Sequence, residues 1–300
     1  MPMDVVRHSF RSMGTDVTLI VGADAEPDRF AAARATVERI FAREETRFSR
    51  FRGDSELSAV NARAGSPTRV SSPFARLLAF ALDAARRTNG RFDPTVLDAV
   101  IAAGYDRNFD EVLAGARVAL RPGRPAGRWD RIALHGDEVL LPADVGLDFG
   151  GVAKGWTVDL AAAAAFSAGL AWAVVNAGGD LRVVGEVPAP GIEVGIDDPE
   201  APGDEIARLV LGSGAIATSS VTRRAWGPGL HHLIDPMTGT PADSGTLQAT
   251  AWAPTCAEAE VRAKEAVLEG EPALERIAAV LVTADGRIVT NVEGAMEVAA

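Results

Sequence analysis

Cysteine, lysine and tyrosine are scarce in this chain of 300 residues, which has one cysteine, two lysines and one tyrosine. The single cysteine, Cys256, excludes an intramolecular disulfide and a multi-cysteine metal cluster, and it fits a reducing cytoplasm. No apolar run approaches the roughly 20 residues that a membrane helix needs. The start of the chain also lacks the charged-then-apolar order of a secretory signal. The sequence therefore predicts a cytoplasmic globular protein without a membrane span.

Acidic residues outnumber basic ones. Asp and Glu total 41 against 30 Lys and Arg, and the net charge of -11 would repel a polyanion, so nucleic acid is not an expected partner. Within the basic set only Lys154 and Lys264 are lysine, and all the others are arginine. A compact ammonium and a planar guanidinium present their hydrogen-bond donors in different geometries. The two lysines in an arginine-rich chain are therefore candidates for function.

Hydrophobic periodicity predicts the α+β class, or mixed α/β, with antiparallel-rich sheets and flanking helices. The length suits one domain over residues 5–300, with a possible subdomain boundary at the Pro- and Gly-rich residues 121–127. Residues 5–21 predict two strands interrupted at Met13-Gly14-Thr15. Helices are expected at residues 28–48, from Ser72-Pro73 to Asn89-Gly90, and at 94–103, 152–168 and 255–268. Further strands are expected at residues 132–134, 139–141, 173–176, 181–184, 192–196, 207–211, 248–252, 280–283 and 288–292.

Polar segments with glycine stand at the ends of several predicted elements, where mixed folds place their binding loops. Residues 90–95 are typical of a helix stop followed by an Asp cap and a proline, and alone they indicate no function. Residues 176–180 end a predicted buried strand in two glycines and Asp180. A plain hairpin turn and a ligand contact are both compatible with that pattern.

Residues 147–159 join an extended run to a helix through Gly150 and Gly151. Such a junction exposes backbone amides, and the start of a helix favours negative charge. Lys154 falls in the first helical turn, where a cation opposes the helix dipole, so a bound phosphate explains it better than packing does. A solvated surface lysine is the alternative. The triplet Asp148-Phe149-Gly150 also occurs in kinases, but no kinase glycine loop or catalytic loop accompanies it.

His231 and His232 precede an Asp-Pro turn. Paired histidines can supply a base near neutral pH or a metal ligand, whereas a lone histidine more often fills a polar position in a wall. Both interpretations stay open. A nicotinamide dehydrogenase is disfavoured because no G-x-G-x-x-G follows an early strand.

Together and in this order, the segments resemble one family, the ApbE-type FAD:protein FMN transferases. The resemblance spans nearly the whole chain and implies an ApbE-like fold of two intertwined subdomains. The implied activity is transfer of FMN from FAD to a Thr or Ser hydroxyl of a target protein, with release of AMP. The matching segments are Met13-Gly14-Thr15, residues 48–58, Asn61, residues 90–95, 148–159 and 176–180, Ala217-Thr218-Ser219, Arg223-Arg224, residues 232–239, and Ala253-Pro254-Thr255.

The resemblance also implies roles for single residues. His232 is expected to lie nearest the proton transfer, and Lys154 is expected to contact the flavin nucleotide and neutralise phosphate charge. The metal, Mg²⁺, would face the carbonyl oxygen of Gly151, with Glu260 at the position of an acidic ligand. The implied flavin contacts are Met13, Phe51, Arg91, Phe92, Asp93, Asp148, Lys154 and Ile234.

This sequence departs from the family pattern at the second ligand position, where Lys264 replaces a threonine. An ammonium offers only hydrogen-bond donors, so Lys264 is no ligand for Mg²⁺. Glu260 and Lys264 have the spacing of an ordinary surface salt bridge on a helix. Our hypothesis is that the Lys264 ammonium, held by Glu260, occupies part of the missing cation's space and faces the FAD pyrophosphate. Ser220 and Thr222 are further departures, from a glycine and a tyrosine.

Two other functions stay open because of these departures. One is an FAD-binding or flavin-carrier protein that lacks transfer activity, since stacking, amide contacts and Lys154 could still bind FAD. The other is a pyrophosphatase that hydrolyses FAD to FMN and AMP. A mass gain of an acceptor protein together with free AMP would separate the transferase from the flavin carrier. Release of free FMN would identify the pyrophosphatase.

Overall fold

A computed structural model of the chain describes residues 3–115, 123–201, 203–292 and 297–298. The described residues within 1–43, 154–219 and 245–300 form a first compact unit, and those within 44–153 and 220–244 form a second. Each unit is built from segments that are far apart in the sequence. Of the expected boundary segment, residues 121 and 122 lie outside the described residues and 123–127 belong to the second unit. The single-domain expectation over residues 5–300 stays a prediction.

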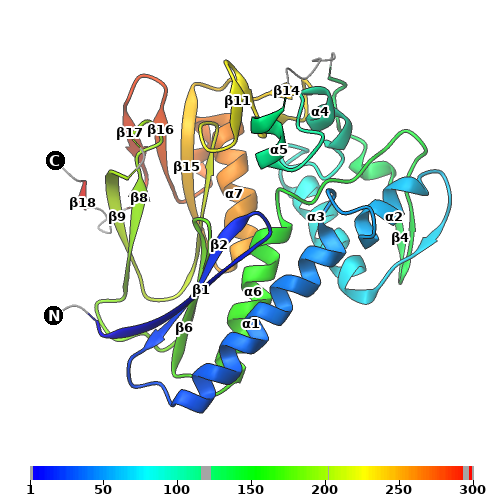
Figure 1. Cartoon of the computed structure of the whole chain (residues 1–300). Helices are drawn as coiled ribbons and strands as arrows, with labels where there is room; N and C mark the ends of the chain where they lie inside the picture. Colours follow the sequence, from blue (N-terminus) through cyan, green and yellow to red (C-terminus); the bar gives the residue numbers. More distant parts are fainter. Residues whose placement is uncertain (1–2, 116–122, 202, 293–296, 299–300) are drawn as a thin grey trace. The chain divides into compact units, whose positions relative to one another are not determined.

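The first unit is built on an eight-stranded sheet (Figure 1). Every pair of neighbours for which the register is defined is antiparallel, which confirms the prediction of antiparallel-rich sheets. In spatial order the strands are β1 (Val5–Ser12), β2 (Thr15–Gly22), β6 (Trp172–Ala177), β7 (Asp180–Gly185), β10 (Gly214–Ser220), β15 (Thr246–Ala253), β16 (Ala279–Thr283) and β17 (Ile288–Thr290).

The two faces of this sheet are covered differently. A ribbon of β8 (Ile192–Asp197) and β9 (Glu205–Leu211), with the short β18 (Glu297–Val298) beside β9, packs on one face through an apolar cluster that includes Leu181 and Val183 of β7. Helices cover the other face (Figure 1): α6 (Ala153–Ser167), α7 (Cys256–Glu269) and most of α1 (Pro27–Phe48), with η2 (Glu271–Glu275) after α7. Because side chains alternate along a strand, Asp180 and Arg182 point to the helices.

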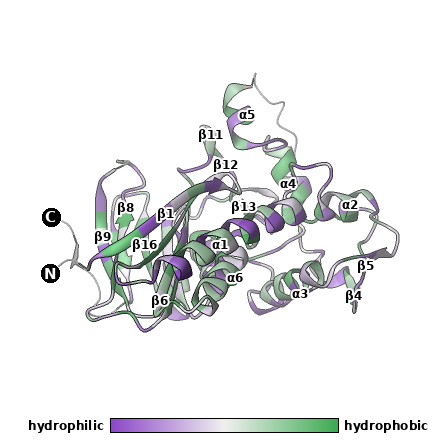
Figure 2. Ribbon diagram, turned by 60° about the horizontal axis from the view of Figure 1, so that its bottom comes forward, coloured by the Kyte–Doolittle hydropathy of each residue, from purple (hydrophilic) through white to green (hydrophobic). Residues whose placement is uncertain are grey.

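The helices of the first unit form as the sequence pattern predicts. Pro27 and Asp28 begin α1, and its buried residues recur at helical spacing, so hydrophilic and hydrophobic stretches alternate along its ribbon (Figure 2). The rings of Phe41 in α1 and Phe10 in β1 meet edge to face at 5.6 Å between centroids. In α6 the alanine run favours helix and allows close approach to neighbours, because alanine has little side chain.

The second unit surrounds a cluster of three phenylalanine rings. Phe74 of α3 contacts Phe48 and Phe149 at centroid distances of 6.1 Å and 5.4 Å. Its helices are α2 (Glu56–Ala62), α3 (Ser72–Arg87), α4 (Leu97–Ala102), α5 (Phe109–Ala114) and η1 (Trp129–Arg131). Its strands are β3 (Thr68–Arg69), β5 (Glu138–Leu140) and β4 (Ala133–His135) in one sheet, and the pairs β11 (Ala225–Gly227) with β12 (Leu230–His231) and β13 (Ile234–Asp235) with β14 (Thr240–Pro241).

Two helices begin at residues other than those predicted, because of local polar contacts. The N-cap of α3 is Ser71, one residue before the predicted Ser72, because the Ser71 hydroxyl accepts the Phe74 N–H at 3.3 Å. The helix expected at residues 94–103 begins only at Leu97. Asp93 binds the N–H and the hydroxyl of Thr95, both at 2.7 Å, and this turn delays the helix.

Candidate functional site

Lys154 lies in the first turn of α6, as the sequence predicts. Its ammonium donates to the carbonyl oxygen of Ala177 at 3.0 Å and to the Asp180 carboxylate. The side chain is 19% exposed, so the alternative of a solvated surface lysine is wrong. Burial disfavours the ammonium, but the nearby carboxylates of Asp180 and Glu260 outweigh it and raise the pKa of Lys154. Lys154 is therefore charged at neutral pH.

A tight turn between β6 and β7 brings Asp180 to Lys154. Ala177 pairs with Asp180, which leaves Gly178 and Gly179 as a two-residue loop with φ angles of 59° and 96°. Such angles favour glycine, and this geometry suits the twist of a hairpin. Residues 176–180 are therefore a hairpin turn whose last residue anchors a buried cation. No specific role was predicted for Asp180 from the sequence, although its position after two glycines was an available signal.

The start of α7 is fixed by α6. Asp159 of α6 accepts the N–H groups of Cys256 and Ala257 at 2.8 Å and 2.9 Å, which satisfies two of the free donors at the start of α7. The helices approach closely at Gly155, where an added Cβ would lie 2.6 Å from the Cys256 carbonyl oxygen. This contact places Glu260, one turn further along α7, against α6.

Glu260 and Lys264 form a buried pair and not an ordinary surface salt bridge. The Lys264 ammonium donates to Glu260 Oε1 at 3.2 Å, and the two side chains are 15% and 3% exposed, respectively. Glu260 Oε2 accepts the backbone N–H of Gly155 at 2.9 Å. Lys154, Asp180, Glu260 and Lys264 together are called the charge cluster below. It contains both lysines of the chain.

The charge cluster does not fit Mg²⁺. The ion prefers a near-octahedral set of oxygen ligands. Both oxygens of Glu260 already accept hydrogen bonds, and Asp180 is held by Lys154. No group of three or more His, Cys, Asp or Glu residues within the described parts of the chain could hold a metal ion. The role of the Gly151 carbonyl, in the second unit, stays a prediction.

In the second unit, Asp148 is held by a residue that the sequence analysis missed. Arg50 Nε donates to Asp148 Oδ2 at 2.9 Å, and both side chains are 9% exposed. The guanidinium lies 4.1 Å from the ring centroid of Phe51 and 4.6 Å from that of Tyr105. Phe51 itself is exposed. Arg50 stood within the matched residues 48–58, and a basic residue between Ser49 and Phe51 was the available signal.

Asp93 and its neighbours are deeply embedded. One Asp93 oxygen binds Thr95, and the other accepts the N–H of Gly127 at 2.6 Å. Burial raises the pKa of Asp93 in spite of these hydrogen bonds. Phe92 is buried and Arg91 is half-buried. The geometry shows a structural role for Asp93, and its predicted flavin contact stays a prediction.

The two adjacent histidines have different environments. His231 is buried and its Nε2 lies 3.1 Å from the carbonyl oxygen of Ala242, so His231 fills a polar position in a wall. Burial lowers the pKa of His231 and keeps its ring neutral at pH 7. His232 is half-buried, and its backbone N–H donates to the carbonyl oxygen of Arg224 at 3.2 Å. The role of His232 in proton transfer stays a prediction.

The remaining predicted residues are placed within their own units. Met13, in the first unit, has a φ angle of 51° in the turn between β1 and β2 and is half-buried. Ile234 is buried in the second unit with Tyr105 and Val100. The structure thus brings Lys154, Glu260 and Lys264 together in the first unit, and Phe51 and Asp148 around Arg50 in the second.

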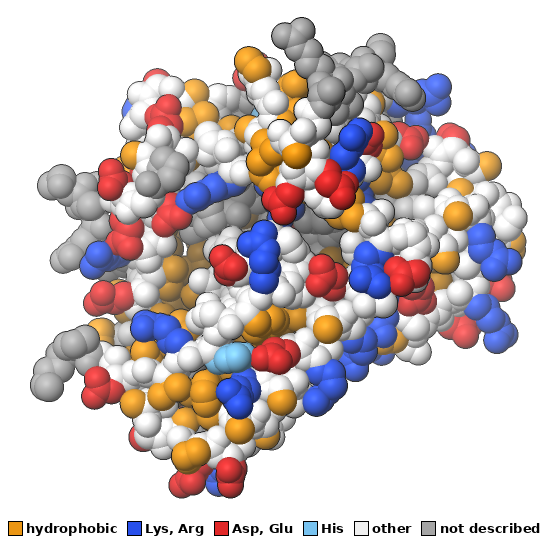
Figure 3. All heavy atoms as spheres, viewed as in Figure 1, with side chains coloured by type: hydrophobic (Ala, Val, Ile, Leu, Met, Phe, Trp, Pro, Cys, Tyr) orange, Lys and Arg blue, Asp and Glu red, His pale blue; other side chains and the backbone are white. Residues whose placement is uncertain are grey.

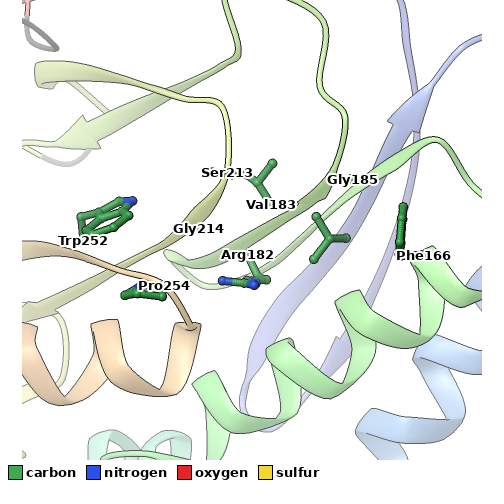
Figure 4. Close-up of a pocket in the computed structure, with 9 residues that line it drawn as sticks. Phe166, Arg182, Val183, Gly185, Ser213, Gly214, Trp252 and Pro254 are labelled. Atoms are coloured by element: carbon green, nitrogen blue, oxygen red, sulfur yellow. The ribbon is translucent and has the colours of Figure 1, made fainter.

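A separate hollow of about 530 Å³ opens in the first unit. Figure 4 shows Phe166 and Trp252 at opposite sides of it, with Arg182 between them. Arg182 Nε lies 3.7 Å from Asp159, which caps α7. None of the residues predicted for the site lines this hollow. The hollow is therefore distinct from the charge cluster.

The distribution of charge and the character of the helices are as follows. On the face in Figure 3, acidic and basic side chains of the described residues are interspersed and form no continuous basic surface. Within the described parts of the chain, none of the helices has the length and apolar character to cross a membrane.

Comparison with known proteins places the sequence and fold in one family. The ApbE family model matches residues 13–284. The FAD:protein FMN transferase of Treponema pallidum is 30% identical over 263 residues, which cover 78% of this chain and 71% of the relative. The protein of the same name from Rhodobacter capsulatus is 33% identical over 79% of this chain, but the match spans only 48% of that longer protein.

A solved structure shares the fold. The ApbE protein of Thermotoga maritima superimposes with a TM-score of 0.83 over 96% of this chain and 97% of its own, at 24% sequence identity. This similarity confirms the predicted ApbE-like arrangement of helices and antiparallel sheets. Because the family model covers most of the chain, the chain belongs to the ApbE family.

Proposed function

We propose that this chain is an FAD:protein FMN transferase that acts on a Thr or Ser hydroxyl of an acceptor protein. The names of its relatives support the reaction. The observation that carries the proposal in this chain is the buried, charged Lys154 at the start of α6, beside the tight turn of residues 176–180. A helix start with an ammonium in its first turn suits a phosphate group.

The reaction is a displacement at phosphorus. The acceptor hydroxyl oxygen forms a bond to the phosphorus of the FMN half of FAD, and the bond from that phosphorus to the bridging oxygen breaks. AMP leaves with the bridging oxygen, and the hydroxyl proton passes to a base and then to solvent or AMP. The acceptor gains one FMN less the elements of water. The chain mainly has to align the groups and neutralise charge.

The proposed roles follow the side-chain chemistry. His232 accepts the hydroxyl proton, the role that the sequence predicts for it, whereas His231 fills a polar position in a wall. Lys154 and Lys264 neutralise phosphate charge. Asp148, fixed by Arg50, orients the flavin, and the exposed ring of Phe51 offers a stacking surface. Met13, Arg91, Phe92, Asp93 and Ile234 remain the other proposed flavin contacts. No step is assigned to Mg²⁺, because the charge cluster does not fit it.

A flavin-binding protein without transfer activity is the second candidate function. The buried Lys264 at an expected metal-ligand position favours it, because one positive charge stands in place of two. If the chain is the transferase, the cytoplasmic location predicted from the cysteine content would limit its acceptors to proteins inside the cell.

The direct test incubates the purified chain with FAD and immobilised peptides that each carry one Thr or Ser. We expect covalent flavin fluorescence on an acceptor, a mass gain of one FMN less water, and an equal amount of AMP. FMN and AMP released without acceptor modification would indicate a pyrophosphatase. FAD binding without AMP would indicate the carrier. His232→Ala should slow transfer and AMP release while FAD affinity is kept, and equal loss of both would make His232 a binding residue.

A further inference from the structure

The charge cluster is a buried set of two cations and two anions. The side chains of Asp180 and Glu260 are 2% and 3% exposed, and those of Lys154 and Lys264 are 19% and 15% exposed. Removing ions from water is costly unless each is paired and hydrogen-bonded. Replacing such a group by apolar residues is often neutral or stabilising, so the cluster has little justification as a stabilising device. A role in binding explains it better.

Lys264 has more donors than the protein uses. An ammonium carries three N–H groups. Lys264 donates only to Glu260 among the residues that the structure describes, whereas Lys154 donates both to Asp180 and to the Ala177 carbonyl oxygen. The Lys264 ammonium is thus held at one corner by a carboxylate, with its other donors open to an acceptor from outside the chain.

The disagreement with Mg²⁺ points in the same direction. Each oxygen of Glu260 already accepts one hydrogen bond, from the N–H of Gly155 and from the Lys264 ammonium. At Glu260 Oε1 the position of a metal ion is taken by the Lys264 ammonium, which is itself a cation. Lys264 is one of only two lysines in a chain whose other basic residues are arginine, and a compact ammonium resembles a point charge more than a planar guanidinium does.

We infer that the Lys264 ammonium is the built-in cation of this site and binds a phosphate oxygen of FAD without a divalent metal ion. This inference rests on the proposed function, because it names what holds the diphosphate there. Glu260 fixes the ammonium, and Asp180 fixes Lys154, so two lysines present fixed positive charge to one diphosphate. Phosphate recognition by lysine as a point charge is ordinary chemistry.

The first experiment measures FAD affinity of the full chain by flavin fluorescence, in excess EDTA and in excess MgCl₂. We expect the two dissociation constants to agree within about twofold, and Lys264→Thr to weaken binding in EDTA by about tenfold, because a charged hydrogen bond is lost. The matched control is Arg262→Thr, since Arg262 pairs with Glu258 at the same i,i+4 spacing on α7, 3.3 Å apart. That variant should keep the affinity.

The second experiment measures metal binding directly, through the EPR signal of free Mn²⁺ in the presence of FAD. The wild-type chain should remove no more Mn²⁺ than FAD alone does. The double variant Glu260→Asp with Lys264→Thr restores two oxygen ligands, and we expect it to bind Mn²⁺ and to bind FAD more tightly with metal than with EDTA. Thermal unfolding followed by circular dichroism identifies any variant that fails to fold. If Lys264→Thr fails to fold, Lys264→Arg, which keeps the charge, replaces it in the comparison of FAD affinities.

The possible failures are distinguishable. Loss of wild-type FAD binding in EDTA, or Mn²⁺ uptake by the wild-type chain with FAD, would overturn the built-in cation and leave the proposed function standing. Unchanged affinity in Lys264→Thr would also overturn it. Absence of FAD binding in both buffers would overturn the proposed function together with the inference.

Discussion

Arg50 illustrates at the residue scale how a buried cation can be held by several weak and strong contacts at once. Its guanidinium is paired with Asp148 and lies over the rings of Phe51 and Tyr105. Its Nη2 is buried and has no hydrogen-bond partner among the described residues. An unpaired buried donor is costly. The position of Arg50 is therefore set by its ion pair and its ring contacts, although one of its N–H groups lacks a hydrogen-bond partner. Asp148 depends on this placement.

Arg50→Ala should therefore lower the free energy of unfolding by about 3–5 kcal/mol, because it leaves the buried Asp148 carboxylate without its cationic partner and with only the N–H of Gly150. Arg52→Ala is the matched control two residues away, where the pair with Asp54 is exposed on both sides. No measurable change is expected for the control. Urea unfolding curves of the two variants give the comparison. A similar small effect in both would show that the Arg50 contacts contribute little.

His231 gives the chain a pH dependence whose sign follows from burial. Burial lowers the pKa of His231 below its ordinary value of 6.5, and unfolding restores that value. Between the two values the unfolded chain binds more protons than the folded chain, so the contribution to stability is present above pH 6.5 and is lost as the pH falls. His231→Gln should reduce the loss of unfolding free energy between about pH 7.5 and about pH 5.5.

The control for this comparison is His135→Gln, because His135 is exposed. Its loss of stability over the same pH range should match that of the wild-type chain. The measurement is urea unfolding of the three proteins at both pH values. An unchanged slope in His231→Gln would show that another group causes the pH dependence.

At the scale of elements, the contact between α6 and α7 sets the charge cluster. Asp159 of α6 caps α7, and Gly155 of α6 lets the Cys256 backbone approach. Glu260 then reaches the N–H of Gly155. A side chain at position 155 would separate the two helices at the point where they hold this hydrogen bond.

Gly155→Ala should destabilise the chain by about 1–3 kcal/mol, because its Cβ would meet backbone atoms of Cys256 and Ala257 within 2.9 Å. FAD affinity should fall with it, since Glu260 and Lys264 would move. Gly212→Ala in the same unit is the control, because nothing lies within 4 Å of its added Cβ. Thermal unfolding and flavin fluorescence test both variants. Equal behaviour of the two would mean that α7 adapts without cost.

The elements that the sequence predicted well are those with a strong local pattern. The two long packing helices α1 and α3 and the strands β1 and β2 follow the periodicity of apolar residues and have clear turn signals. The strand β10 was missed, because its small residues carry little strand propensity and its place beside β7 depends on distant pairing. The short α2 was missed because seven residues give no clear period.

At the scale of the whole molecule, the sequence indicated the family but not the partners of the charged residues. Lys154 and Lys264 stood out by composition alone. Their environment could not be predicted, since Asp180 reaches Lys154 only through the β6–β7 turn and Glu260 reaches Gly155 across two helices. Such contacts depend on sheet order and helix packing, which local sequence does not specify. For the same reason Arg50 was missed.

The position of both lysines in one buried cluster makes cleavage after lysine a test of the first unit as a cooperative whole. Complete cleavage by a lysine-specific protease produces the fragments 1–154, 155–264 and 265–300, and a single cut leaves 1–264 or 155–300. Both sites lie inside helices with side chains at most 19% exposed, so cleavage requires opening of α6 or α7. We expect cleavage of the native chain to be about tenfold or more slower than by an arginine-specific protease, which finds exposed residues such as Arg63.

Because Lys154 and Lys264 belong to the same cluster, the two cleavages should appear together, and their rate should rise with urea in parallel with the loss of helical circular dichroism. Addition of FAD in EDTA should slow both, since a ligand held by the two lysines stabilises the closed state. Early release of residues 265–300 alone would show that α7 opens independently of α6, and the charge cluster would then not connect the two helices. Mass spectrometry of timed digests separates these outcomes.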